Sequence, residues 1–187
     1  MQRLELVISR EDHGFLLDLP TILSSTLFEL QMNEARQEIK KTIALLEPLS
    51  DDYASGFTYA PGKWTIKQIV GHLNDAERVL SYRALHLARR DPAPLSSFEQ
   101  DDYVAQSAAN SRSLGSLLDE LKAVRQSSLA LFRSLPDEAW LFRGRVSDWN
   151  LTVRGILFTV AGHELHHYRI LQKHYIRGES AKRTFTS

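Results

Sequence analysis

Apolar side chains recur with the period of an α-helix in four segments of the chain. In each segment they stand three and four positions apart, the spacing that places side chains on one face of a helix. The first stripe runs through Phe28, Met32, Ala35, Ile39, Thr42, Leu46 and Leu49, and the third through Leu114, Leu117, Leu121, Val124, Ser128, Leu131 and Leu135. Each stripe has a single polar exception. The pattern therefore predicts two amphipathic helices over these ranges.

The second and fourth segments also carry signals for their ends. Thr65 can act as N-cap of the second helix, with Gln68 reaching back from three residues later in a capping box, and Pro92 and Pro94 follow its end. The fourth helix is expected to begin at Asn150 or Thr152 and to stop at Gly178. The second stripe runs Ile69, His72, Ala76, Val79, and the fourth Val153, Ile156, Val160, His163, His167, Ile170, His174.

Two long polar connections separate these helices, one over residues 91–111 and one over residues 136–150. Connections of this length can carry the chain along a whole bundle before the next helix begins. We therefore predict an all-α fold, a four-helix bundle with long connections, as one domain over residues 24–187. Residues 1–23 are an N-terminal arm to which the pattern assigns no structure.

Composition and charge remove several classes of function. Lys and Arg together number 23, as do Asp and Glu, so no net positive field exists to hold nucleic acid. No segment is long and apolar enough for a membrane span, and the start lacks a signal-peptide pattern, so a cytoplasmic protein is expected. The chain has no cysteine, and any metal would therefore need nitrogen and oxygen ligands.

The stretch AGHELHHYRIL, residues 161–171, places histidines on an inward-facing stripe. His163 and His167 are four apart, so their side chains lie one above the other on a helix, and His72 holds an inward place on the second helix. Burying imidazoles without partners costs on the order of 1–3 kcal/mol each. A divalent ion on His72, His163 and His167 would offset that cost, and three ligands leave positions open for a reactant.

Other polar residues near these histidines are weaker candidates. Glu164 and Asp75 could accept a hydrogen bond from a metal-bound imidazole and so orient it. Gly71 and Gly162 each precede a histidine, where close helix approach would explain the absence of a side chain. The remaining histidines are interpreted as structural: His13, His86, His166 and His174.

The letters HELHH, residues 163–167, also satisfy H-E-x-x-H, in which two histidines bind zinc and the glutamate is the general base of a metalloprotease. Only 20 residues follow the motif, which leaves little room for a third ligand downstream. No alternating strand pattern precedes it to provide a sheet edge for a peptide substrate. The protease is therefore the weaker interpretation.

The pair WTIKQIVGHLNDAERV, residues 64–79, and VRGILFTVAGHELHHYRIL, residues 153–171, resembles the DinB-like superfamily of metalloenzymes. The resemblance covers about residues 24–175. Its most specific parts are the Trp-Thr start of the second helix at Trp64, H-L-x-D-x-E from His72 and G-H-E-x-H-H from Gly162. It implies an up-down-down-up four-helix bundle that is often a homodimer. It also implies a divalent metal such as nickel or zinc on His72, His163 and His167.

Relatives in this superfamily include transferases and isomerases that use small thiols such as bacillithiol, mycothiol or glutathione, so the resemblance implies a small-molecule substrate. A three-histidine metal can lower the pKa of an external thiol and so activate a nucleophile that a cysteine-free chain lacks. Our leading hypothesis is a metal-dependent thiol transferase. The alternatives are a hydrolase that uses water activated by the metal, and a non-enzymatic stress-related bundle whose histidines only form hydrogen bonds.

Overall fold

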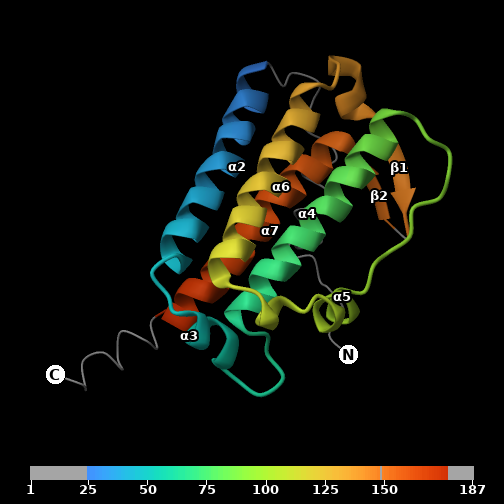
Figure 1. The fold of residues 1–187 in the computed structure, drawn as a ribbon. Coiled ribbons are helices and arrows are strands. Elements are labelled where there is room, and N and C mark those ends of the chain that lie inside the picture. The colour runs from blue at the N-terminus through green and yellow to red at the C-terminus, as the bar shows by residue number, and fades with distance from the viewer. Residues whose placement is uncertain (1–24, 148, 177–187) are drawn as a thin grey trace.

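Four long helices form the protein in a computed structural model, which describes residues 25–147 and 149–176. They are α2 (Ser25–Leu46), α4 (Ile66–Ala88), α6 (Leu114–Arg133) and α7 (Val153–Ile170). In Figure 1, α2 and α7 run in one direction and α4 and α6 in the other. This confirms the all-α, up-down-down-up four-helix bundle. The predicted arm over residues 1–23 and the predicted stop at Gly178 lie outside the described residues.

The ends of the helices follow the signals in the sequence. The Thr65 hydroxyl accepts a hydrogen bond from the Gln68 amide at 3.2 Å, and the Gln68 side chain accepts one from the Thr65 amide at 2.9 Å. This is the predicted capping box, which satisfies two amide groups that the first turn leaves unpaired. At α7 the Thr152 hydroxyl caps the amide of Gly155 at 2.9 Å. Helix α4 ends at Ala88, ahead of the two prolines.

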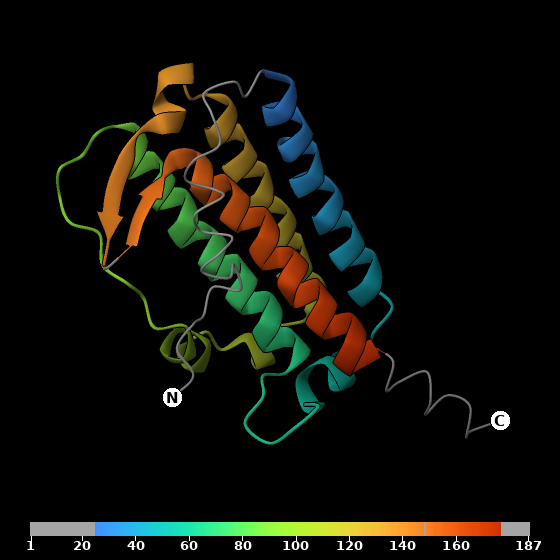
Figure 2. The ribbon, with the colours of Figure 1, turned by 180° about the vertical axis from the view of Figure 1, so that it is seen from behind.

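The apolar stripes meet in the interior as two clusters of buried side chains. One cluster includes Met32 and Phe132, which are fully buried, and the other includes Ile66 and Leu117. The polar exception on α6 is accounted for, because the Ser128 hydroxyl lies 2.8 Å from that of Ser81 on α4. In Figure 2, which shows the back of the bundle, α7 lies between α2 and α4.

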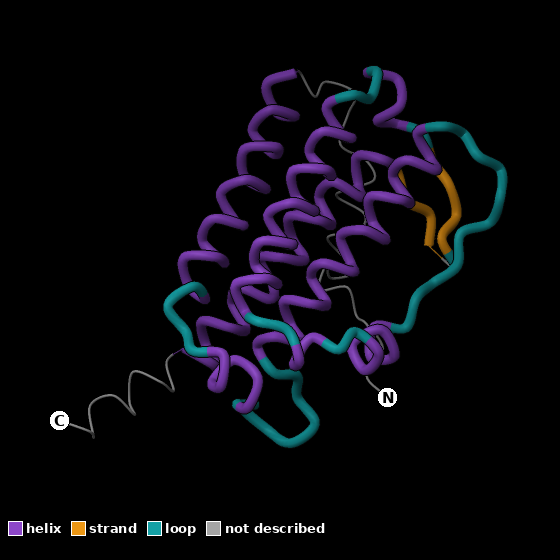
Figure 3. Tube along the Cα trace, in the orientation of Figure 1, coloured by secondary structure: helices purple, strands orange, loops and turns teal. Residues whose placement is uncertain are grey.

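The connections contain short elements that the periodicity did not predict. Helix α3 (Asp51–Gly56) precedes α4, and α5 (Gln100–Gln106) with a 3₁₀ turn (Ala109–Ser111) precedes α6. A 3₁₀ turn (Asp137–Leu141) and an antiparallel hairpin of β1 (Arg143–Val146) and β2 (Trp149–Thr152) fill the link before α7. Figure 3 shows the hairpin at the edge of the helices. Each strand has four residues, too few for an alternating pattern to stand out.

Helix α7 does not simply stop at its last α-helical residue. A π-helical turn (Leu171–Ile176) continues it and places Tyr175 in the interior. The Tyr175 hydroxyl donates to the backbone carbonyl of Trp64 at 2.5 Å, and the Tyr53 hydroxyl donates to the carbonyl of Tyr175 at 2.7 Å. The end of α7 is thereby fixed to the residues that lead into α4. Within the described residues, none of the helices is long and apolar enough to cross a membrane.

Candidate metal centre

Helices α4 and α7 bring His72, His163 and His167 together in the interior. The Nε2 atom of His163 lies 3.0 Å from Nε2 of His72 and 3.2 Å from Nε2 of His167. One nitrogen of each ring lies within 4.8 Å of the other two. His72 and His167 are buried and His163 is partly buried. The three histidines that the sequence predicts to face inward therefore direct a ring nitrogen each toward the same point.

Hydrogen bonds between the rings cannot satisfy this arrangement. A neutral imidazole nitrogen carries either one hydrogen or one lone pair, so Nε2 of His163 can complete only one of its two short contacts. Two nitrogens held about 2.0–2.1 Å from a tetrahedral zinc ion would lie about 3.3–3.4 Å apart, close to the separations observed. The donor set and its spacing thus fit a divalent cation.

The environment keeps these imidazoles neutral, which is the form that binds a metal. Burial lowers the pKa of His72 to about 4, and the nearby His166 adds to the effect. Burial, with a contribution from His72, lowers the pKa of His163 to about 3. The pKa of His167 also lies well below its usual value, again chiefly because of burial. At neutral pH all three lone pairs are available.

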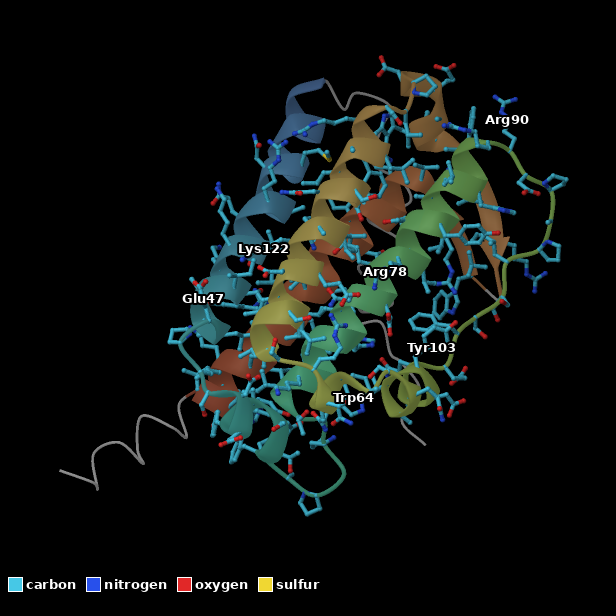
Figure 4. The ribbon with its side chains drawn as sticks, viewed as in Figure 1. Glu47, Trp64, Arg78, Arg90, Tyr103 and Lys122 are labelled. Atoms are coloured by element: carbon cyan, nitrogen blue, oxygen red, sulfur yellow. The ribbon has the colours of Figure 1, made fainter. Side chains whose placement is uncertain are left out.

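An aromatic side chain forms one wall of the site. The ring of Trp64, the residue before the N-cap of α4, lies with its centroid 4.8 Å from that of His72 and stacks at 6.5 Å on that of His167. Its backbone carbonyl accepts the hydrogen bond from Tyr175 described above. Figure 4 labels Trp64 at the end of the bundle where α4 begins. The indole thus restricts access of water to the histidines from this side.

The Nδ1 atoms of His72 and His167 are buried and have no hydrogen-bond partner in the described part of the chain. Metal-bound histidines usually donate this N–H to a carboxylate or carbonyl, the role that the sequence offered to Glu164 and Asp75. In the structure both carboxylates lie beside arginines instead. Glu164 binds Arg125 at 2.6 Å, and Asp75 lies 3.7 Å from Arg78. Burial raises the pKa of Asp75.

Glu164 belongs to a buried cluster of charges that connects all four helices. The Arg125 guanidinium donates to both carboxylate oxygens of Glu77, at 2.8 and 3.0 Å, and to Glu164. It also donates to the backbone carbonyl of Ala35 on α2. Burial acts to lower the pKa of Arg125, but the two carboxylates outweigh it and hold the pKa above its ordinary value. The cluster fixes Glu164, and with it the turn of α7 that carries His163.

The histidines interpreted as structural lie outside the cluster. His86 is buried and its Nε2 atom lies 2.9 Å from the carbonyl of Ala93. His174 stacks on Tyr59 at a centroid distance of 4.5 Å. The ring of His166 is half-buried beside that of His167, at 5.2 Å, and is not among the converging ligand atoms. His13 lies in the part of the chain that the structure does not describe.

The two glycines have different surroundings. A Cβ at Gly71 would lie 3.1 Å from that of Ala109, so the turn before α6 does approach α4 closely at this point. A Cβ at Gly162 would have no atom within 4 Å outside its own helix. The prediction of a close approach therefore holds for Gly71, where the neighbour is the 3₁₀ turn before α6 and not the other helix that carries metal ligands. It does not hold for Gly162.

Sequence reasoning missed Trp64 and the partners of Glu164. Trp64 stands outside the helical pattern, and its only signal was the Trp-Thr start of the second helix within the resemblance. The members of the charge cluster each follow a stripe position by one residue, which places them about 100° around the helix: Glu77, Arg125 and Glu164. At that angle the apolar pattern cannot tell a solvent-exposed charge from a buried one.

The fold and the site are those of a four-helix-bundle protein with a candidate three-histidine metal centre. A profile of the DinB superfamily matches residues 34–171, and the chain belongs to that superfamily. The structure is also similar to YfiT from Bacillus subtilis, described as a probable metal-dependent hydrolase with an unusual four-helix bundle topology. The TM-score is 0.71 at 17% identity, over 90% of this chain and 94% of that one.

A second solved structure, a mycothiol-dependent maleylpyruvate isomerase, is similar with a TM-score of 0.65 and 13% identity. The match covers 81% of this chain and 60% of the isomerase, which is therefore the longer protein. No curated protein matches the chain in sequence. At these identities the two structures demonstrate a shared fold and leave the reaction of this chain open.

Proposed function

We propose that this protein is a metal-dependent enzyme that holds one divalent cation on His72, His163 and His167. The observation that carries the proposal is the convergence of three Nε2 atoms on one point, with separations of 3.0 and 3.2 Å. Nickel and zinc are the ions we expect, because the resemblance to the DinB-like superfamily implies them and imidazole suits both.

The residues around the site have separable tasks in this proposal. The three imidazoles hold the ion, and their burial keeps them unprotonated. Trp64 packs on two of the rings and limits the positions from which a reactant can approach. The Arg125 cluster fixes the rotation of α7 through Glu164. The Nδ1 atoms of His72 and His167 are buried on the far side of the rings from the ion, so a bound water, and not the substrate, is the partner that could satisfy them.

We further propose that the reaction is the transfer of a small thiol to an electrophilic small molecule. The thiol would lose its proton, its sulfur would bond to the electrophilic carbon, and the leaving group on that carbon would depart as an anion. An ion with open coordination positions lowers the pKa of a thiol that binds to it, which supplies the nucleophile absent from this chain. The existence of a mycothiol-dependent enzyme with this fold supports the choice. Hydrolysis of an ester or amide is the second candidate, supported by the description of YfiT as a probable metal-dependent hydrolase.

Metal content tests the site directly. Protein purified without a histidine tag should contain or take up about one equivalent of nickel or zinc, measured by mass spectrometry of the metal after dialysis. His163→Ala should bind almost none. His166→Ala is the matched control, because that histidine is on the same helix yet outside the ligand set, and it should bind as wild type does.

A second readout of binding comes from Trp64. Nickel beside the histidines should quench its fluorescence, and Trp64→Phe should remove the response while Trp140 and Trp149 remain. If wild type and His163→Ala are both free of metal after loading, the site proposal is wrong, and the non-enzymatic bundle with hydrogen-bonded histidines becomes the better explanation.

Activity assays separate the two reactions. Metal-loaded protein would be mixed with glutathione, mycothiol or bacillithiol and the electrophile monochlorobimane, and in parallel with a panel of esters and amides. Thiol-dependent turnover that His163→Ala abolishes would support the transferase. Thiol-independent cleavage of an ester or amide would support the hydrolase and contradict the transferase.

The expected homodimer, the absence of a nucleic-acid partner and a cytoplasmic location remain predictions from the sequence and its resemblance. Light scattering coupled to size-exclusion chromatography measures the first. A mass near 21.3 kDa in solution would contradict the dimer, because that is the mass of a single chain.

A further inference from the structure

Helices α2 and α6 enclose a groove on a face of the bundle that carries no metal ligand. The cavity has a volume of about 630 Å³, within the range of small-molecule sites. Its lining includes the apolar side chains of Ile39, Ile43 and Leu129. Ile39 and Leu129 are buried and Ile43 is half-buried, so the floor of the groove is hydrocarbon.

Cations border this apolar floor. Arg36 and Lys40 on α2, and Lys122 and Arg133 on α6, line the groove, against a single acid, Glu47. Lys122 has an ion pair with Asp119 at 3.0 Å. Within the described residues, Arg36, Lys40 and Arg133 have no ion pair with a carboxylate. These three positive charges are therefore available to an anion.

The charges also give the groove a direction. Because α2 and α6 run antiparallel, Arg133 at the C-terminus of α6 marks one end of the groove, and Arg36, near the middle of α2, is the lining residue of α2 nearest to that end. Glu47, just after the end of α2, marks the opposite end, and Lys122 lies between the two ends, near the middle of α6; Figure 4 labels both. An elongated ligand with one anionic end would place that end beside the two arginines and its apolar part along Ile39, Ile43 and Leu129.

We propose that the α2–α6 groove binds a long-chain carboxylate, with its headgroup at Arg36 and Arg133. The apolar floor removes the alkyl chain from water, and the guanidinium groups match the planar carboxylate. A second copy of this chain is a poorer occupant, because a twofold pairing would place two surfaces together that each carry more positive than negative charge. The inference does not depend on the proposed function, since α2 and α6 contribute none of the three histidines.

Calorimetric titration of the full chain with dodecanoate, below its micelle concentration, tests this inference. Dodecyltrimethylammonium is the matched ligand, with the same chain and the opposite charge. We expect dodecanoate to bind with about one-to-one stoichiometry and the cationic ligand to bind at least about tenfold more weakly. Metal-loaded and metal-free protein should give the same result, so failure here and failure of the metal site are distinguishable.

Charge reversal identifies the site. Arg133→Glu and Arg36→Glu should each weaken dodecanoate binding by about tenfold or more. Arg89→Glu is the control for Arg133→Glu, because Arg89 is also an exposed arginine at a helix C-terminus, and it should change affinity by less than about twofold. Ile43→Trp, which fills the groove without changing charge, should also reduce binding.

Three results would overturn the inference. The first is equal binding of the two amphiphiles, and the second is an Arg133→Glu effect no larger than that of Arg89→Glu. The third is an absence of dodecanoate binding, including the case in which an acidic amphipathic peptide binds instead. Circular dichroism of each variant confirms that it is folded before binding is measured.

Discussion

Replacing Arg125 with methionine removes the one positive charge of a buried cluster and leaves two carboxylates behind. The side chains of Arg125, Glu77 and Glu164 are only 3%, 5% and 2% exposed. The substitution deletes the paired hydrogen bonds to Glu77, the bond to Glu164 and the bond to the carbonyl of Ala35. Unlike a surface ion pair, this loss leaves the carboxylates uncompensated in the interior.

Breaking a buried ion pair from one side costs about 3–5 kcal/mol, a large part of the roughly 5–15 kcal/mol that stabilises a domain. We expect Arg125→Met to lower the free energy of unfolding by this amount, measured by urea denaturation of metal-free protein at pH 7.5. Arg78→Met is the control. Arg78 pairs with Glu120 at 2.7 Å but is half exposed, so its loss should cost about 0–1 kcal/mol.

The cost of Arg125→Met should also depend on pH. Burial already raises the pKa of Glu164 against the effect of Arg125, and without the arginine the pKa should rise further. The folded variant then binds protons that the unfolded chain releases above about pH 4.5, so its stability falls as pH rises. The difference from wild type should be smaller at pH 5 than at pH 8.

A triple variant separates charge burial from packing. Glu77→Leu, Arg125→Met and Glu164→Leu together leave no buried charge at this point and should recover most of the lost stability. If Arg125→Met costs no more than Arg78→Met, or costs the same at pH 5 and pH 8, then the cluster is not the buried ionic contact described here.

Further predictions concern the histidines, the glycines and a helix cap. The metal-free protein should become less stable as pH falls from about 6.5 towards 4, because His72 takes up a proton in the unfolded chain but stays neutral when buried in the folded protein. His72→Gln should remove on the order of 3 kcal/mol of this pH dependence, measured by urea denaturation in EDTA. Gly162→Ala should raise the unfolding temperature, since alanine stabilises a helix interior by about 0.5–1 kcal/mol and meets no neighbour, whereas Gly71→Ala should not, because its Cβ would crowd Ala109. Thr65→Ala should cost about 1 kcal/mol in chemical denaturation by removing the cap of α4, and an unchanged midpoint would contradict the capping box.

The helices could be predicted because their signals are local. The stripe from Ile69 and the cap at Thr65 depend only on residues within a few turns of one another, and the same holds for α7 after Thr152. The hairpin of β1 and β2 has no such signal. It is held by contacts with distant residues, such as the bond from the Ser147 amide to the carbonyl of Leu95 and the packing of Gly144 on Leu87.

The candidate site was predictable in part for the same reason. Spacing alone placed His163 and His167 on one side of a helix, and His72 on the inward side of another. Their separations of 3.0 and 3.2 Å follow from how α4 and α7 pack. Spacing could not show that Glu164 faces Arg125 instead of an imidazole. A residue 100° around the helix from the inward stripe can face solvent or another helix, and the spacing is the same in both cases.

By itself, the sequence determined four amphipathic helices, the cap of the second, the absence of thiol ligands and an inward set of imidazoles. The tertiary structure decided which nitrogens meet, that Trp64 lies beside the rings of His72 and His167, and that Arg125 neutralises carboxylates from two other helices. The physical reason is that side-chain direction is set within a few residues of backbone, whereas the approach of two side chains on different helices depends on the packing of the whole interior.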